Sequence, residues 1–407
     1  MKADIKVAVI GGGAAGFFTA LSVKEHNPSA KITLFEKTTK VLTKVKISGG
    51  GRCNVTNAVT DLEILCGAYP RGGKQLRNSF FKFDTTDTQK WFESRGVSLK
   101  TEIDGKVFPV SNNSQSIIDC LINQAKKSEV VIEYNSAIKS LVKKNLQWLL
   151  HIQNKIQPQI FDYVVVASGG SPKRKGFEWL LNLGHSISTP VPSLFTFNMP
   201  HESITQMMGV TIEQAQIKIK GTSIETKGPL LITHWGMSGP AILKASALGA
   251  RILNDLNYTF EIEINWVMER NTEVLFLKLQ EFADQYPQKT LLKKKGFLLP
   301  NRLWQYLIKK SGIPLDKKWC ELGKKKIRHL VELLSSDTYS VVGKTTFKEE
   351  FVTCGGIKLK NIDLKTMQSK SCPNLYFAGE VLDIDAITGG FNFQAAWTTG
   401  FIAGKLG

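Results

Sequence analysis

The sequence predicts an α/β fold whose sheet is built from both ends of the chain and is interrupted by a long insertion. Three observations predict it. A buried strand runs directly into a glycine-rich turn at the start of the chain. The middle of the chain changes to a two-residue alternation and then to a helical period. A buried strand pattern returns after about residue 350 and is followed by a final apolar helix.

The first strand and its turn are typical of dinucleotide binding. Residues 7–16 read VAVIGGGAAG, which places Gly11, Gly13 and Gly16 at the glycine positions of a G-x-G-x-x-G turn. Gly11 allows the tight turn, Gly13 lets backbone N–H groups approach a pyrophosphate, and Gly16 lets the next helix pack on the strand. The helix N-terminus would then face the phosphates. The spacing alone also occurs in turns that bind no ligand.

The second strand strengthens this interpretation. It ends in Glu36, about 20 residues after Gly16, where a carboxylate can bond a ribose 2′-OH. The alternative for Glu36 is an exposed residue at a strand end. Strands are expected at 5–10, 31–36, 130–134 and 162–167, with helical stretches between them. The last strand lies in FDYVVVASGG, a continuous apolar run that indicates a buried parallel strand. We expect a Rossmann-like domain over 1–193 and 350–407.

The insertion has its own two patterns. Tyr258 to Trp266 alternates apolar and polar side chains, as half-buried antiparallel strands do. Apolar residues then recur at a helical period. We therefore expect an inserted β-barrel at 194–270 and 335–349, and a helical subdomain at 271–334.

Three separated segments together indicate one cofactor. They are GGGAAG with Glu36, the ASGG end of the 162–167 strand, and AGE followed by TGGFNFQ near the carboxyl end. This combination resembles glutathione-reductase-like FAD domains. The resemblance implies that an acid of the last segment bonds the ribityl chain and that the final helix N-terminus faces the flavin pyrimidine. A helix N-terminus would stabilise the negative charge that develops there on reduction.

Further motifs narrow the resemblance. KVKISGGGRCNVTN at 44–57, THWGMSGP at 233–240 and VTCGG at 352–356 are similar to the family of FAD flavoproteins that includes aminoacetone oxidase, BaiN and YhiN. Residues 105–109 and 366–370 also match. The resemblance spans nearly the whole chain and implies an FAD domain with a barrel-plus-helices insertion. The three cofactor segments and the lack of a convincing flavin-attachment motif predict that the FAD is bound non-covalently. Family members carry out different reactions, so the substrate stays open.

The motifs and the resemblance together give the expected site residues. The expected cofactor-binding residues are Gly11, Gly13, Ala14, Ala15, Gly16, Glu36, Lys37, Ser48, Gly49, Gly51, Arg52, Cys53, Asn54, Ala137, Ile138, Ala167, Ser168, Gly169, Gly379, Glu380, Asp383, Gly390, Phe391 and Asn392.

Three side chains have competing interpretations. Arg52 can pair with a phosphate or a polar substrate, or form a structural salt bridge. Cys53 could be a nucleophile, but it lacks a partner cysteine and is expected to be a packed residue. His234 is the candidate catalytic acid or base, and the alternative is a histidine fixed in its turn by hydrogen bonds. Ser238 is expected to cap the helix that Pro240 begins.

Composition limits the partners. The six scattered cysteines form neither a disulfide framework nor a zinc motif, so no metal is expected. No apolar run is long enough to span a membrane, and the first strand starts too early for a signal peptide, so a cytoplasmic location is expected. The net charge is +18, and 291–329 holds twelve Lys or Arg against two acids. Nucleic acid could bind there, but sparse aromatic residues favour a solvated helical surface.

The sequence therefore predicts an FAD-dependent oxidoreductase that transfers hydride between flavin N5 and a small organic substrate. The substrate is expected between the flavin and the turn around His234. No second G-x-G-x-x-G follows a strand after Gly170, so NAD(P)H would be a transient co-substrate, and oxygen is the other candidate redox partner. Two rivals stay open: an RNA- or tRNA-modifying flavoprotein, and a flavin-bearing sensor or scaffold with little turnover.

Overall fold

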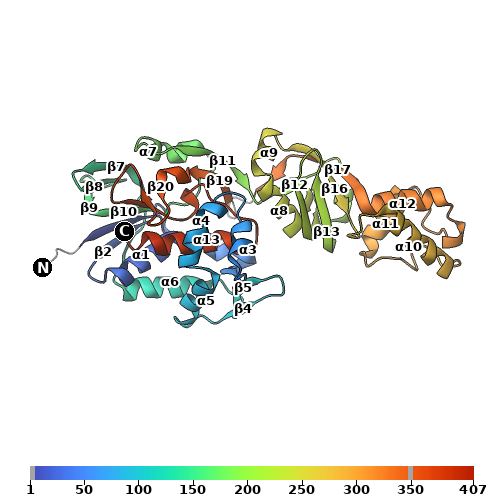
Figure 1. The fold of residues 1–407 in the computed structure, drawn as a ribbon, viewed down its shortest axis with the longest axis horizontal. Coiled ribbons are helices and arrows are strands. Elements are labelled where there is room, and N and C mark those ends of the chain that lie inside the picture. The colour runs from blue at the N-terminus through green and yellow to red at the C-terminus, as the bar shows by residue number, and fades with distance from the viewer. Residues whose placement is uncertain (1–4, 347–351) are drawn as a thin grey trace. The chain divides into compact units, whose positions relative to one another are not determined.

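The structure, a computed structural model, describes residues 5–346 and 352–407 and divides the chain into two units (Figure 1). The first unit comprises 1–193 and 347–407, and the second comprises 194–346. The helices expected at 271–334 fall in the second unit together with its sheet. The finer division into three domains stays a prediction.

The first unit is built on a seven-stranded sheet with the order β20-β21-β22-β10-β1-β2-β6. The strands from β22 to β6 run parallel, and β20 and β21 extend the β22 edge in the antiparallel sense. The four strands predicted for this domain are confirmed, and β22 joins them from the end of the chain. The bounds are β1 (Lys6–Ile10), β2 (Lys31–Phe35), β6 (Val131–Glu133), β10 (Tyr163–Val166), β20 (Ile362–Asp363), β21 (Gln368–Ser369) and β22 (Leu375–Phe377).

Two helices from opposite ends of the chain, α1 (Ala14–His26) and α13 (Phe391–Ala403), lie side by side (Figure 1). Both are buried along most of their length, as helices in a domain core are. The first turn of α1 and the first turn of α13 are therefore fixed by packing. The other helices of this unit are α2 (Thr43–Ile47), α3 (Leu62–Gly67), α4 (Gly73–Lys82), α5 (Thr85–Glu93), α6 (Gln115–Lys127) and α7 (Glu178–Leu181).

Two small antiparallel sheets occupy stretches for which the sequence predicted helix or no structure. They have the orders β3-β5-β4 and β7-β8-β9. Their strands are short, and β7 buries one of its seven residues, so they lack the long apolar pattern that identifies a strand. The bounds are β3 (Thr56–Asn57), β4 (Leu99–Thr101), β5 (Lys106–Pro109), β7 (Ile138–Lys144), β8 (Gln147–Ile152) and β9 (Gln159–Phe161).

A fourth sheet of the first unit consists of β11 (Ile187–Ser193) and β19 (Val352–Ile357), which pair in the antiparallel sense. The chain leaves the first unit directly after β11 and returns to it just before β19. We call this pair of strands the linker ladder.

The second unit contains a seven-stranded antiparallel sheet with the order β17-β16-β13-β14-β15-β12-β18. Its two end strands, β17 and β18, are separated by Gly343 alone, so the sheet has to curve back on itself. The bounds are β12 (Thr196–Asn198), β13 (Thr211–Ile219), β14 (Glu225–Thr233), β15 (Gly236–Ser238), β16 (Thr259–Asn265), β17 (Asp337–Val342), β18 (Lys344–Thr345), α8 (Pro240–Leu248), α9 (Ala250–Asp255), α10 (Thr272–Gln285), α11 (Asn301–Lys310) and α12 (Lys324–Ser336).

A buried carboxylate links the helices of the second unit to its sheet. Asp337, 1% exposed, pairs with Lys310 at 2.6 Å and accepts a hydrogen bond from Trp266 at 3.1 Å. Burial raises the pKa of Asp337, and Lys310 partly offsets that rise. Within residues 5–346 and 352–407, we find no helix with the length and apolar character of a membrane span.

Candidate cofactor site

In the glycine turn after β1, two positions have no room for a side chain and a third position has free space around it. A Cβ atom on Gly11 would lie 2.3 Å from the Ala167 carbonyl oxygen, and one on Gly16 would lie 1.8 Å from the Gly11 oxygen. A Cβ on Gly13 would meet no protein atom within 4 Å. Gly13 is the N-cap of α1 and provides no side-chain cap. The first turn of α1, which includes Ala14, therefore presents open backbone, as a bound pyrophosphate requires.

Glu36 is held at the carboxyl end of β2, beside this turn. Its Oε2 accepts a hydrogen bond from the Gly12 N–H at 3.0 Å, and its Oε1 accepts from the Thr38 N–H at 2.9 Å. The Ser136 N–H donates to the Glu36 carbonyl at 2.8 Å, which brings Ala137 and the start of β7 to the same edge. The exposed Lys37 follows. These positions suit recognition of the adenosine half of a dinucleotide.

The segment after β10 reaches the same edge of the sheet. The Ala167 N–H donates to the Ile10 carbonyl at 2.8 Å, so this segment lies against the glycine turn. Ser168 is exposed, and Gly169 is left-handed with no atom within 4 Å of a Cβ position. The structure thus brings together the three strand ends that the sequence singled out, and the open glycines fit a ligand that approaches backbone.

The glycine-rich loop at 48–51 forms a tight turn in which Gly49 and Gly50 are left-handed. Gly50 and Gly51 are open, with no atom within 4 Å of a Cβ position. Arg52 next to them pairs with Glu102 at 2.6 Å, and its guanidinium lies 3.9 Å from the centre of the Phe108 ring. For Arg52 the structure therefore shows the structural salt bridge, and a cofactor contact stays a prediction.

Cys53 is fully buried and left-handed, with φ 62°. Burial raises the pKa of its thiol to about 12, although a hydrogen bond with Ser48 opposes the rise. The thiol is protonated at neutral pH and is a poor nucleophile. This supports the expectation that Cys53 is a packed residue.

The rest of that motif holds the N-terminus of α13. With its amide oxygen facing Gly390, Asn54 accepts from the Gly390 N–H at 2.9 Å. Asn57 donates to the Gly389 carbonyl at 3.0 Å, and Thr56 donates to Gln394 at 2.6 Å. We call Asn54, Thr56 and Asn57 the helix clamp. The sequence suggested direct flavin contact for this loop and missed Thr56 and Asn57, which act on the helix that resembles the flavin-facing one.

Two predicted cofactor residues of the last segment have protein partners. The Glu380 carboxylate accepts from Lys44 Nζ at 2.7 Å and from the Thr353 N–H at 2.8 Å. Asn392 forms a reciprocal pair with the backbone of Ala386, at 3.0 and 3.1 Å.

The neighbouring residues of this segment are also fixed. The Gly379 N–H donates to the Thr399 hydroxyl at 2.8 Å. The Tyr69 hydroxyl donates to the backbone carbonyl of the buried Phe391 at 2.6 Å. Asp383 accepts from the Ser188 hydroxyl. The acids and the helix start are therefore preorganised by the protein.

Sequence reasoning missed Arg71, which makes a two-pronged ion pair with the fully buried Asp385. Burial raises the pKa of Asp385, and the Arg71 guanidinium opposes that rise. Asp385 stands out because it precedes the TGG turn, but no sequence signal identifies its distant partner.

His234 lies in the second unit, in the turn between β14 and β15. It is exposed, and its ring centre lies 4.4 Å from that of Trp235. In the part of the chain that the structure describes, the imidazole makes no hydrogen bond or ion pair, so it is not fixed by such bonds. The expected Ser238 cap is wrong. Gly239 is the N-cap of α8, and no side chain caps this helix. Gly239 has φ 94°, and a Cβ there would lie 2.9 Å from the Pro229 oxygen.

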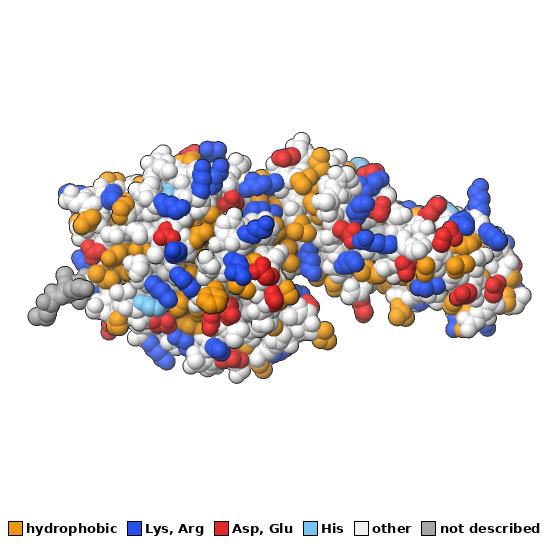
Figure 2. Space-filling model, viewed as in Figure 1, with side chains coloured by type: hydrophobic (Ala, Val, Ile, Leu, Met, Phe, Trp, Pro, Cys, Tyr) orange, Lys and Arg blue, Asp and Glu red, His pale blue; other side chains and the backbone are white. Residues whose placement is uncertain are grey.

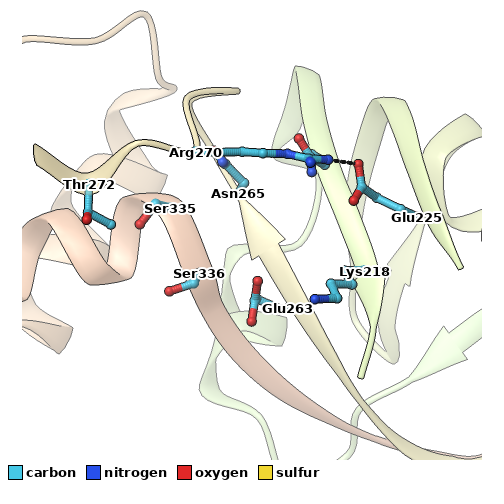
Figure 3. Close-up of a pocket in the computed structure, with 9 residues that line it drawn as sticks. Lys218, Glu225, Glu263, Asn265, Arg270, Thr272, Ser335 and Ser336 are labelled. Atoms are coloured by element: carbon cyan, nitrogen blue, oxygen red, sulfur yellow. Dashed lines mark hydrogen bonds and ion pairs between the residues drawn. The ribbon is translucent and has the colours of Figure 1, made fainter. Parts of the chain in front are cut away.

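A polar cavity of about 240 Å³ lies within the second unit, and Figure 3 shows Arg270 reaching across it to Glu225. It is smaller than the roughly 300–1,000 Å³ of small-molecule sites and offers no apolar wall to a flavin ring. We do not assign the cofactor to it. Its lining residues are Gln216, Lys218, Glu225, Glu263, Asn265, Arg270, Thr272, Ser335 and Ser336.

Comparison with known proteins identifies the family. Residues 5–406 match the HI0933-like protein Rossmann domain. The chain belongs to this family. It is an FAD-dependent oxidoreductase, as the sequence predicted, and its Rossmann fold and FAD cofactor are confirmed.

Relatives and a solved structure agree with this membership. The chain is 24% identical over 408 residues to the 3-dehydro-bile acid delta(4,6)-reductase of Clostridium scindens, with 98% of each chain covered. It is 27% identical over 405 residues to the ribosomal RNA dihydrouridine synthase of Haemophilus influenzae, with 97% of this chain and 96% of the relative covered. A flavocytochrome c3 fumarate reductase in an open conformation has the same fold, with TM-score 0.51, 17% identity, and coverage of 100% of this chain and 78% of that chain.

The purified protein should be yellow and should release its FAD on acid precipitation. The open backbone at Gly13 and Gly169 offers non-covalent contacts, and the buried Cys53 thiol is unsuited to covalent attachment. Absorbance of the supernatant after precipitation, followed by chromatography against FAD and FMN, checks this. Flavin that stays with the pellet, or a colourless protein that gains no flavin spectrum with added FAD, would contradict it.

Proposed function

We propose that this protein reduces a carbon–carbon double bond conjugated to a carbonyl group, with NAD(P)H as the electron source. The names of the two relatives support this. A delta(4,6)-reductase of a 3-dehydro-bile acid acts on double bonds conjugated to a ketone, and a dihydrouridine synthase saturates the uracil double bond next to a carbonyl. The substrates differ widely, but the bond type is the same.

One observation carries the proposal: the N-terminus of α13 is rigidly presented by the helix clamp. Gly390 is left-handed, and a Cβ there would lie 2.3 Å from the Thr56 carbonyl oxygen. No acid lies in the first turn of α13, so nothing there opposes the positive end of the helix dipole. Bound FAD supplies hydride transfer at N5. The helix terminus would stabilise the reduced, more negative cofactor and so ease its reduction by NAD(P)H.

The other site residues would bind FAD and orient it. The open first turn of α1 would hold the pyrophosphate, Glu36 the ribose, and Glu380 the ribityl chain. NAD(P)H would alternate with the reducible substrate, because the sequence has no second dinucleotide turn for it. We propose His234 as the proton donor to the substrate.

Flavin bleaching in an anaerobic stopped-flow spectrometer tests the reaction. NADPH or NADH should bleach the flavin, and a conjugated enone or uridine-containing RNA should restore its colour, whereas the saturated ketone or dihydrouridine should not. Bleaching that only oxygen reverses would make the protein an oxidase. No bleaching by nicotinamides and no turnover would favour the sensor or scaffold.

One observation bears on whether RNA could carry the double bond. The first turn of α12 holds Lys324, Lys325 and Lys326, all exposed, and its N-cap Gly323 provides no side-chain bond. Three cations at the positive end of a helix destabilise it, so an anionic partner would explain them. On the face drawn in Figure 2, however, basic side chains are interspersed with acidic ones. We therefore expect weak binding.

RNA binding should be weak and should fall steeply with salt. Changing Lys324, Lys325 and Lys326 to Glu should lower the slope of log K against log salt, by about 0.7 to 0.9 for each phosphate that these lysines neutralise. Filter binding or anisotropy at several salt concentrations measures it. The matched control changes the exposed Lys139, Lys143 and Lys144 of the first unit, which alters net charge equally. Equal effects would indicate non-specific attraction. Tight binding that survives moderate salt and needs the α12 lysines would make an RNA-modifying enzyme the leading interpretation.

A further inference from the structure

The linker ladder pairs the strand that ends where the chain leaves the first unit with the first described strand after the chain returns to it. Its register runs from Ile187 paired with Ile357 to Ser193 paired with Val352. Ser193 is the last residue of the first unit before the chain enters the second. Local opening of these two strands would therefore free the chain at Ser193 and at Val352 together.

Three acids of the cofactor segment each hydrogen-bond to this ladder. Glu380 accepts from the Thr353 N–H at 2.8 Å, and Asp385 accepts from the Ser193 hydroxyl at 2.8 Å. Asp383 accepts from the hydroxyl of Ser188. The acids lie within six residues of each other, between β22 and α13, so one short segment contacts both strands of the ladder.

Close backbone packing joins the same two segments. A Cβ on Gly356 would lie 2.5 Å from the Val381 carbonyl oxygen, and the Asp383 N–H donates to the Ile357 carbonyl at 2.9 Å. The fully buried Thr353 also places its hydroxyl 2.4 Å from the Cβ position of Gly170, which follows β10. The ladder therefore touches two of the three segments that form the cofactor site.

The three acids differ in how far they are buried, and therefore in whether a bound cofactor could contact their carboxylates. Asp385 is fully buried, and both its oxygens are engaged by Arg71 or Ser193, so it is an anchor. Glu380 and Asp383 are half-buried and belong to the residues expected at the cofactor. A ligand that fixes their carboxylates would also fix the strands to which they are bonded.

We propose that Glu380, Asp383 and Asp385 are positioning residues that couple FAD occupancy to the stability of the linker ladder. Coupling of this kind is reciprocal: if FAD stabilises the ladder, removal of the ladder bonds weakens FAD binding by the same factor. The proposal rests on FAD binding alone and not on the reaction proposed above. It assigns the two serines of β11 a function that no sequence motif indicates.

Amide hydrogen exchange, read by mass spectrometry, tests the coupling. In the wild-type protein, FAD loading should slow exchange in 187–193 and 352–357 by about 5- to 150-fold, the usual range of such coupling. Amides of β13 and β14 in the second unit are the internal reference and should change little. Ser188→Ala with Ser193→Ala should keep a flavin spectrum but abolish most of this slowing, and the FAD Kd should rise correspondingly.

A control variant and a milder single variant complete the test. Ser79→Ala removes a buried hydroxyl of the same unit that, among the described residues, bonds only the Leu364 carbonyl, and it should behave as wild type. If the double variant fails to fold, Ser188→Ala alone, at a half-buried position, should speed ladder exchange in the FAD-loaded protein and leave β13 and β14 unchanged. Ladder exchange that is indifferent to FAD, or variants that retain the full wild-type slowing, would overturn the proposal. Neither outcome bears on which substrate is reduced.

Discussion

Gly13→Val should abolish FAD binding, with a Kd raised at least about 100-fold, and should leave the fold intact. Gly13 has a negative φ of −93°, which valine tolerates, and a Cβ there meets no protein atom within 4 Å. The added methyl groups would instead fill the space through which a pyrophosphate approaches the first turn of α1. A 100-fold change corresponds to about 2.8 kcal/mol. Flavin titration measures the Kd, and circular dichroism with thermal unfolding measures the fold.

Substitutions of two other glycines provide a control that should bind FAD and a variant that should not fold. Gly323→Val is the matched control, since Gly323 is also open and has a negative φ of −72° but belongs to the second unit, and this variant should bind FAD normally. Gly16→Val should fail to fold, because its Cβ would lie 1.8 Å from the Gly11 carbonyl oxygen. A yellow Gly13→Val protein with the wild-type flavin spectrum would show that the pyrophosphate lies elsewhere.

The sequence predicts well the part of the site that is formed by residues close together in the chain. The strand before Gly11, the helix after it and the strand ending in Glu36 form one continuous unit, and each has a distinctive pattern. Their observed bounds differ by a residue or so from those expected. The carboxyl ends of parallel strands share one edge, so the meeting of Gly11, Glu36 and Gly169 follows from the topology.

The rest of the site depends on contacts between residues that are far apart in the sequence. Asn57 and Gly389 are 332 positions apart, and Arg71 and Asp385 are 314 apart, so no local pattern connects them. Each residue type also has several ordinary roles: an Arg beside glycines pairs as readily with Glu102 as with a phosphate. Sequence therefore marks the Asn54 motif as special but does not show that it acts on α13.

His234→Ala should leave the FAD spectrum unchanged and slow the substrate-dependent half-reaction by about 100- to 10,000-fold, the usual contribution of a general acid or base. The side chain is exposed, and in the described chain it makes no hydrogen bond that the substitution would break, so the fold should survive. Trp235, which donates to Thr196 at 3.1 Å, keeps the turn in place. Stopped-flow reoxidation of the reduced protein by substrate measures the rate, and reduction by NAD(P)H, which needs no such proton, serves as the internal reference and should be unaffected.

Cys53→Ser separates this acid–base assignment from thiol chemistry. The Cys53 thiol is fully buried and its pKa is raised to about 12, so it contributes packing and its replacement should change the rate far less than replacement of His234. Both variants should be measured with the same substrate and at matched flavin loading, because a small shift in packing near 48–54 can change FAD occupancy without touching the chemistry. An unimpaired His234→Ala beside an inactive, flavin-loaded Cys53→Ser would overturn the assignment and make the thiol the reacting group.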